Sequence, residues 1–376
     1  MDFSDVCGQY LGRWAQILAV GSSLLTLLGG GIVYWILMSN FMYNVVTFIY
    51  RCPDAVDSGS NKSHANHSLG VYFLSSSSDH THDATFDRVW DEYHTVPFFL
   101  VLVLGPLINF KSPTFFTKFN ALGTISVCYL VSFVAYNTSQ WGINLPFDNL
   151  YSNLADHVYI PDFRGTFVAL TGIAALAYFV QNCVISICRN QRHPENNVRD
   201  LIIAYILVAV TYIYMGTMFY AAFPLNKDCI ADNLLNNIAD TNVFAFVARI
   251  GLFFQMMCVF PLLLYIFRVQ LLHSLFGSVW PSLKHVLVLN AILVAICILF
   301  AVFLPHIGTI IGFVGAFCGF SYAILLPCLV YLKTKYLDGT ITKPSIIFHS
   351  FLVLLGFGNF VGQFVLLGHK EDTIYK

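Results

Sequence analysis

Residues 284 to 304 read KHVLVLNAILVAICILFAVFL, with a lysine at the first position and no other Asp, Glu, Lys or Arg. A bilayer hydrocarbon core about 30 Å thick is crossed by about 20 apolar residues in an α-helix. Because the backbone of a helix satisfies its own hydrogen bonds, it is also the form that such a segment takes in lipid. This stretch therefore predicts a membrane-spanning helix.

The composition of the whole chain agrees with that prediction. Of its 376 residues, 57% are apolar and 10% are charged, and the mean hydropathy is +0.70. A soluble domain carries about 25% charged residues. The net charge is −1 and the sequence has no basic tract, which excludes nucleic acid, a polyanionic partner and a basic membrane-surface patch as binding functions.

Eight further apolar runs predict additional helices, which makes the chain an all-α, multi-pass membrane protein. The nine runs cover 15 to 49, 96 to 110, 115 to 136, 166 to 188, 200 to 223, 242 to 267, 284 to 304, 308 to 332 and 345 to 368. The first is expected to form one long tilted helix, kinked at Gly29 to Gly31. The domain layout is an N-terminal segment (1 to 14), a membrane domain (15 to 368) and a C-terminal tail (369 to 376).

Charges and sequons predict the same orientation. Of the 19 Lys and Arg residues, eleven lie on the N-terminal side of the predicted spans, seven lie on the other side, and Arg249 lies within a span. The positive-inside rule then places the N-terminus in the cytosol and the C-terminus in a lumen. The loop 51 to 94 carries two sequons, at Asn61 and Asn66, and glycosylation there requires lumenal exposure. A third sequon, at Asn137, adjoins a predicted helix end.

Most of the ten cysteines lie in apolar runs, where Cys serves as a small hydrophobic residue. Cys52 and Cys229 are the two that fall in predicted lumenal loops, where disulfides persist. We expect them to pair, with two free thiols as the alternative.

Enzyme signatures are missing from this sequence: it has no GxSxG, HExxH, P-loop or CxxC motif, and the interior of the predicted spans holds no Asp or Glu. What remains there is a set of neutral polar residues. In secondary transporters such groups, with exposed backbone, hold ions and zwitterions. They also serve helix packing, as does the series Gly312, Gly315 and Gly319. The pocket candidates are Ser39, Asn40, Asn120, Gln181 and Asn182.

Arg249 is expected near the lumenal interface, with its charge reaching the headgroups. The stretch from Arg249 to Val259 also fits a loose cholesterol-contact pattern, which makes the sterol a candidate partner besides the lipid bilayer.

Four stretches resemble a known family: GGGIVYWILMSNFMYN (29 to 44), LINFKSPTFFTKFNALGTISVCYL (107 to 130), ENNVRDLIIAYILVAVTYIYMG (195 to 216) and ARIGLFFQMMCVFPLLLYIFRVQLL (248 to 272). They are similar to a lysosomal, arginine-responsive branch of solute carrier family 38, of the amino acid/auxin permease type. The resemblance implies an inverted-repeat, LeuT-like transporter body, with about nine of the family's eleven spans present. It also implies a lysosomal or late endosomal location.

The function implied by this resemblance is efflux of neutral and essential amino acids such as leucine, linked to arginine and to nutrient sensing upstream of a growth-control kinase. Implied partners are Ragulator and the Rag GTPases. One alternative is a sensor that signals without net flux. Another is a truncated or isoform chain without transport activity, because Met1 falls where the relatives enter their third span and the docking tail would be absent.

Two departures from the family pattern concern the expected site. Sodium is the implied co-substrate, with no organic cofactor, and the relatives place a Thr shortly before a Pro as a sodium ligand. Here that position is Cys258, before Pro261. Because a hard cation prefers oxygen to thiol sulfur, this change argues against strong sodium coupling. The family's His before Asn in the sixth span is Gln181 here.

Overall fold

The computed structural model describes residues 3–57, 86, 89–110, 118–144, 167–181, 184, 188, 191, 193–225, 227–239, 242–278 and 281–374. Helices dominate these ranges, which confirms the predicted all-α, multi-pass architecture. Six helical stretches are long and apolar enough to cross a membrane: Arg13–Tyr50, Pro194–Ala222, Val243–Phe276, Leu283–Phe303, Ile307–Leu337 and Lys343–Val365.

Each of the nine predicted runs contains a helix, but three of these helices fall outside the six long apolar ones. Two are short: α4 (Val96–Ile108) has 13 residues and α7 (Phe167–Ala177) has 11. At a rise of 1.5 Å per residue they reach only about 20 and 16 Å. The third, α6 (Asn120–Trp141), is a continuous helix of 22 residues, but Asn, Ser and Thr side chains lower its apolar character.

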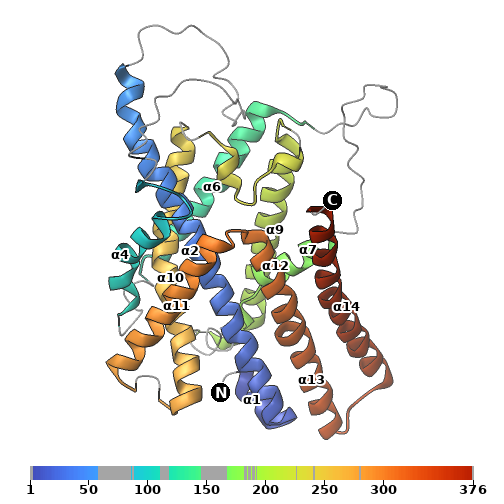
Figure 1. The fold of residues 1–376 in the computed structure, drawn as a ribbon. Coiled ribbons are helices and arrows are strands. Elements are labelled where there is room, and N and C mark those ends of the chain that lie inside the picture. Colours follow the sequence, from blue (N-terminus) through green and yellow to red (C-terminus); the bar gives the residue numbers. More distant parts are fainter. Residues whose placement is uncertain are drawn as a thin grey trace, which may run out of the picture.

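The helices form one bundle in which α2 runs through the centre (Figure 1). In Figure 1, α4 and α14 lie at opposite sides of the bundle, and α1 lies at its foot with the N-terminus. The remaining elements are α1 (Phe3–Leu11), α2 (Arg13–Asp57), α9 (Asn197–Ala222), α10 (Val243–Phe276), α11 (Leu283–Phe303), α12 (Ile307–Cys318), the π-helix η4 (Gly319–Leu325), α13 (Leu326–Leu337) and α14 (Lys343–Ile374), with short 3₁₀ turns η1 (Pro194–Asn196), η2 (Lys227–Cys229) and η3 (Leu234–Asn237).

The long helix α2 confirms the prediction of one continuous element, since its 45 residues extend through the glycine triplet without interruption. A Cβ on Gly29 would lie 2.8 Å from Val314 of α12, and one on Gly30 would lie 3.2 Å from Leu263 of α10. These glycines therefore allow two helices to approach α2 closely. Close packing is therefore a role of these glycines, while a kink at Gly29 to Gly31 remains a prediction.

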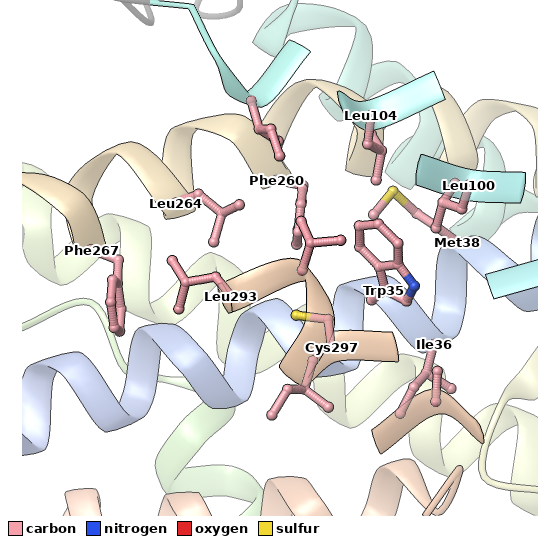
Figure 2. Close-up of a cluster of buried hydrophobic side chains, with 14 of the residues drawn as sticks. Trp35, Ile36, Met38, Leu100, Leu104, Phe260, Leu264, Phe267, Leu293 and Cys297 are labelled. Carbon is pink, nitrogen blue, oxygen red and sulfur yellow. The ribbon is translucent and has the colours of Figure 1, made fainter. Parts of the chain in front are cut away.

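The main core joins α2, α4, α10 and α11 in one cluster of apolar side chains (Figure 2). Trp35 of α2 is fully buried, and its ring lies 5.6 Å from that of Phe260 in α10. Leu100 and Leu104 of α4 are fully buried in the same cluster. Close packing of this kind drives helix association where lipid is as apolar as the core. It also fixes α4, and with it the segment that leads into α4.

Buried polar side chains form hydrogen bonds with the backbone at the C-terminal end of α4. Asn290 of α11 donates from Nδ2 to the carbonyl of Ile108 (3.2 Å) and to Oδ1 of Asn109 (2.9 Å). Arg268 of α10, 1% exposed, donates to the carbonyl of Phe110 (3.3 Å). Carbonyls at a helix C-terminus have no partner within the helix, and here two neighbouring helices supply one.

Candidate functional site

The helix α7 ends in the middle of an apolar run. The run 166 to 188 was expected to form one span, yet α7 stops at Ala177 and residues 178 to 180 are not helical. The backbone N–H of Val180 donates to Oε1 of Gln181 (3.0 Å), and that of Phe179 donates to the carbonyl of Leu176 (3.0 Å). A side chain that bonds to nearby backbone competes with the helix in this way.

The break exposes backbone carbonyls, and tyrosines of α9 bind them. In a continuous helix the carbonyls of Ala177 and Tyr178 would accept from N–H groups four residues onward. Here Tyr212 donates from its hydroxyl to the carbonyl of Ala177 (3.2 Å), and Tyr205 donates to that of Tyr178 (3.5 Å). Carbonyls at the C-terminal end of a half-helix carry partial negative charge and attract cations.

A cavity of about 540 Å³ lies between this break and α9. Its walls include Ala177 to Val180 on one side and Tyr205 and Tyr212 on the other. One part of it is polar, since Gln191 donates from Nε2 to Oδ2 of Asp200 (2.5 Å). The volume lies within the range of small-molecule sites.

The helix α7 packs closely against α12 and the start of η4 at glycines of both partners. A Cβ on Gly172 would lie 2.6 Å from the carbonyl oxygen of Gly312, and one on Gly315 would overlap the carbonyl oxygen of Gly172. One on Gly319 would lie 2.6 Å from Cβ of Ala175. The predicted packing role of Gly312, Gly315 and Gly319 is confirmed, and it brings the break in α7 beside the π-helix.

Serines connect this π-helix to α2. Ser22 and Ser321 share a buried hydrogen bond of 2.8 Å, and Cys318 donates from Sγ to the carbonyl of Ser22 (3.3 Å). The ring of Phe179, in the α7 break, lies 5.3 Å from that of Tyr322. π-Helical turns often mark functional positions, and irregular backbone at membrane depth is tolerated only inside the protein or beside a cavity. We take the break, the π-helix and Ser22 as the candidate site.

The structure places one predicted pocket residue, Gln181, at this site. Ser39 is buried in α2, and its hydroxyl has no hydrogen-bond partner among the described residues. Asn40 binds Glu92 and Asn233 instead of lining the break. Asn120 begins α6 with its side chain outside the described residues, and Asn182 lies outside them altogether.

Cys258, the expected sodium position, lies in a different part of the bundle. It is buried in α10 and lines a cavity of about 330 Å³ with Gly123 and Thr124 of α6. Gln255 also lines this cavity, and its buried Oε1 accepts no hydrogen bond from the described residues. Two side-chain oxygens and a thiol therefore share the space, which is a weak ligand set for a hard cation.

Of the predicted glycosylation and disulfide sites, some lie outside the described residues and others can be placed. Asn61 and Asn66 lie outside the described residues, as does the side chain of Cys52, while Cys229 is exposed in η2. The Cys52–Cys229 pair and the first two glycans therefore remain predictions. Asn137 is 7% exposed, and its Nδ2 donates to the carbonyl of Phe133 (3.0 Å). Because a glycan needs an accessible amide, this burial argues against Asn137 as an acceptor.

Arg249 also departs from expectation, since it is 1% exposed rather than at an interface. Its Nη2 donates to the carbonyls of Leu235 (2.9 Å) and Ile238 (3.3 Å). The guanidinium is thus occupied by backbone carbonyls, which argues against a sterol hydroxyl binding there.

Sequence reasoning missed the tyrosines and serines of the site. Tyr205 and Tyr212 stand seven residues apart, the spacing that puts two side chains on one face of a helix, so this signal was available. Ser22 and Ser321 gave no comparable signal, because each is an isolated small polar residue whose partner lies far along the chain.

Comparison with known proteins adds a family match over almost the whole chain. Residues 1–366 match the family described as "Transmembrane amino acid transporter protein". Individual relatives are named as transporters as well. The chain is 40% identical over 380 residues to the rat (Rattus norvegicus) "Neutral amino acid transporter 9", an alignment that covers 97% of this chain and 67% of the relative.

Two further relatives have a similar sequence identity to this chain. The chain is 42% identical over 388 residues to the Xenopus tropicalis "Neutral amino acid transporter 9", covering 97% of this chain and 68% of that protein. It is 40% identical over 391 residues to the Caenorhabditis elegans "Sodium-coupled neutral amino acid transporter 9 homolog", covering 97% and 62%. The chain spans about two thirds of the length of these relatives.

Proposed function

Since the chain belongs to the transmembrane amino acid transporter family, and is therefore a transporter rather than an enzyme, we propose that it carries neutral amino acids by alternating access. The observation that supports this most is the break in α7 beside the π-helix η4. Transporters of this kind bind substrate where helices are discontinuous, since backbone groups are free there. Rocking of one group of helices against another would then expose that position to each side in turn.

The chemistry of the break suits an amino acid's ammonium group. The carbonyls of Ala177 and Tyr178 are acceptors held by tyrosine hydroxyls at 3.2 and 3.5 Å, distances that are long for O–H···O bonds. An ammonium group carries a full charge and makes a stronger hydrogen bond than a phenol. We propose that it displaces these hydroxyls, which are then free to donate to the substrate's carboxylate.

The finer assignments rest on the family resemblance. We propose a lysosomal or late endosomal location, efflux of leucine and other essential amino acids, a response to arginine, and a link to growth control through Ragulator and the Rag GTPases. Sodium is proposed as a weakly coupled co-substrate, because the expected ligand position holds Cys258.

The proposed orientation has a cytosolic N-terminus and a lumenal C-terminus, supported by the charge bias and the paired sequons. A Cys52–Cys229 disulfide in the lumen belongs to the same proposal. Non-reducing peptide mapping should recover the two cysteines linked, and their recovery as separate alkylated thiols would rule the bond out.

Uptake by proteoliposomes that contain the purified chain tests the proposed function. Labelled leucine should accumulate saturably, with competition by unlabelled leucine and none by N-acetyl-leucine, which lacks the ammonium group. Tyr212→Phe should change the KM for leucine because it alters the carbonyl's partner, whereas Tyr136→Phe, on the exposed side of α6, should not. Saturable binding without uptake would instead support a sensor. Equal competition by N-acetyl-leucine would refute the proposed recognition.

A further inference from the structure

The connection between α9 and α10 folds into the bundle. Residues 227 to 238, called here the inserted segment, contain η2 and η3 and are bound to three helices. Asn233 donates to Oδ1 of Asn40 in α2 (2.9 Å), and Asp232 accepts from the N–H of Gly308 in α12 (3.2 Å). Arg249 of α10 holds the segment's carbonyls at Leu235 and Ile238. A movement of α2 relative to α12 therefore has to release one of these contacts.

Asn40 is the centre of this arrangement, because both the oxygen and the nitrogen of its side-chain amide form hydrogen bonds. Its Oδ1 accepts from Asn233 (2.9 Å) and from Asn44 (3.3 Å), and its Nδ2 donates to Oε1 of Glu92 (2.5 Å). Because the Nδ2 groups of Asn233 and Asn44 are donors only, the oxygen of Asn40 must face them. Its amide nitrogen then has to face Glu92. Consecutive hydrogen bonds therefore join Glu92, Asn40 and Asn233 into one chain of contacts.

Glu92 supplies the carboxyl group at one end of this hydrogen-bonded series, and Asn233 lies at the other end. It precedes α4, is half-buried, and packs against α2 through Asn40. Desolvation by burial raises the pKa of the Glu92 carboxyl above its ordinary value, the charge of Asp91 raises it further, and the hydrogen bond from Asn40 acts in the opposite direction. Removing a carboxylate from water is costly unless it is paired with a cation.

The titratable groups around Glu92 do not supply that cation within the described part of the chain. On its own segment, His94 pairs with Asp91 at 2.9 Å, and on α10 Arg249 is bound to Leu235 and Ile238. On the inserted segment, Lys227 donates to the carbonyl of Phe223 (2.6 Å). Further titratable groups on these elements include Tyr34 and Tyr43 of α2, Tyr93, Cys229 and Asp232 of the inserted segment, and His306 before α12.

We propose that the chain Glu92, Asn40 and Asn233 is a proton-linked latch, in which neutral Glu92 stabilises the inserted position of residues 227 to 238 and ionised Glu92 weakens it. In a released form the carboxyl is hydrated and titrates near its ordinary value. The latched form therefore binds the proton more tightly, and linkage makes acid favour it. The stabilisation is full below the ordinary glutamate pKa and is lost as pH rises through the raised one.

Hydrogen exchange tests this latch without requiring transport. The purified chain in lipid nanodiscs is compared at about pH 5 and about pH 7.5, with amide exchange corrected for its intrinsic pH dependence. Residues 227 to 238 should exchange severalfold faster at the higher pH in the wild type. Glu92→Gln, which mimics the neutral acid, should give slow exchange at both values. Asp91→Asn, a neighbouring acid outside the latch, should retain a rise with pH.

Asn233→Ala provides a second variant whose predicted effect is opposite. It removes the contact with Asn40, so the segment should exchange fast at both pH values. The proposal is overturned if corrected exchange of the wild-type segment does not change with pH, or if Glu92→Gln keeps the wild-type pH dependence. Peptides from residues 13 to 50 of α2 serve as the internal reference for the folded state.

Discussion

Ser22 of α2 and Ser321 of the π-helix share a buried hydrogen bond between residues that stand 299 positions apart. Ser321 also donates to the carbonyl of Phe317 (2.8 Å), and since a hydroxyl has one hydrogen, Ser22 must be the donor in the shared bond. This contact attaches the irregular turn to the central helix at the candidate site.

Loss of this contact should destabilise the bundle by a modest amount. Ser22→Ala leaves a buried hydroxyl of Ser321 without its donor, at a cost of about 1 to 3 kcal/mol. Because both changes remove the same bond, Ser22→Ala and Ser321→Ala should be less than additive in a thermal unfolding cycle. Ser132→Ala serves as control, since this exposed hydroxyl donates to the carbonyl of Cys128 in its own helix. Full additivity of the first two would contradict the pairing.

Gly315→Ala should separate α7 from α12. The added Cβ would overlap the Gly172 carbonyl, and overpacking of this kind costs about 1 to 3 kcal/mol. We expect a lower melting temperature and reduced leucine uptake. Gly216→Ala is the matched control, because among the described residues no atom outside the local backbone of α9 lies within 4 Å of a Cβ at that position. Equal melting temperatures for the two variants would show that the helices tolerate the methyl group.

Arg249→Met should loosen the inserted segment. The change removes hydrogen bonds from a charged donor to two carbonyls, each worth about 1.5 to 3 kcal/mol. Proteolysis and hydrogen exchange should both increase within residues 227 to 238. Arg199→Met removes an exposed arginine that pairs with Asp200, and it should change stability by less than about 1 kcal/mol. An unaltered inserted segment in Arg249→Met would mean that Asn233 and Asp232 suffice.

Cys258→Thr should strengthen the response of leucine uptake to sodium. A hydroxyl would join Thr124 and the Oε1 of Gln255 around the 330 Å³ cavity, giving a third oxygen where the wild type has sulfur. Uptake measured with and without a sodium gradient provides the readout, and Cys128→Thr, an exposed cysteine, is the control. Identical sodium dependence in wild type and Cys258→Thr would exclude this cavity as the coupling site.

Glycosidase treatment should shift the electrophoretic mobility of the expressed protein. Combined Asn61→Gln and Asn66→Gln substitutions should remove that shift, because both sequons lie in the predicted lumenal loop. Asn137→Gln should leave the shift unchanged, since the Asn137 amide is buried and bound to Phe133. A wild-type protein whose mobility never shifts would count against the proposed orientation.

The sequence by itself determined which segments are long and apolar enough to form membrane-spanning helices. Runs such as 284 to 304 cannot be hydrated along 21 residues, so their helical and membrane character follows from composition alone. The polar candidates could not be ranked in this way. Of the five, Gln181 adjoins the break, while Asn40 belongs to the contact with Glu92 and Asn233.

The tertiary structure decided where helices stop and which charges are buried. Apolar residues continue past Ala177, so hydropathy could not show that α7 ends there. At the break, tyrosines of α9 and the side chain of Gln181 form hydrogen bonds with backbone groups that a continuous helix would pair internally. Burial of Arg249 also depends on tertiary contacts, since the carbonyls that bind it come from a connection that folds back into the bundle.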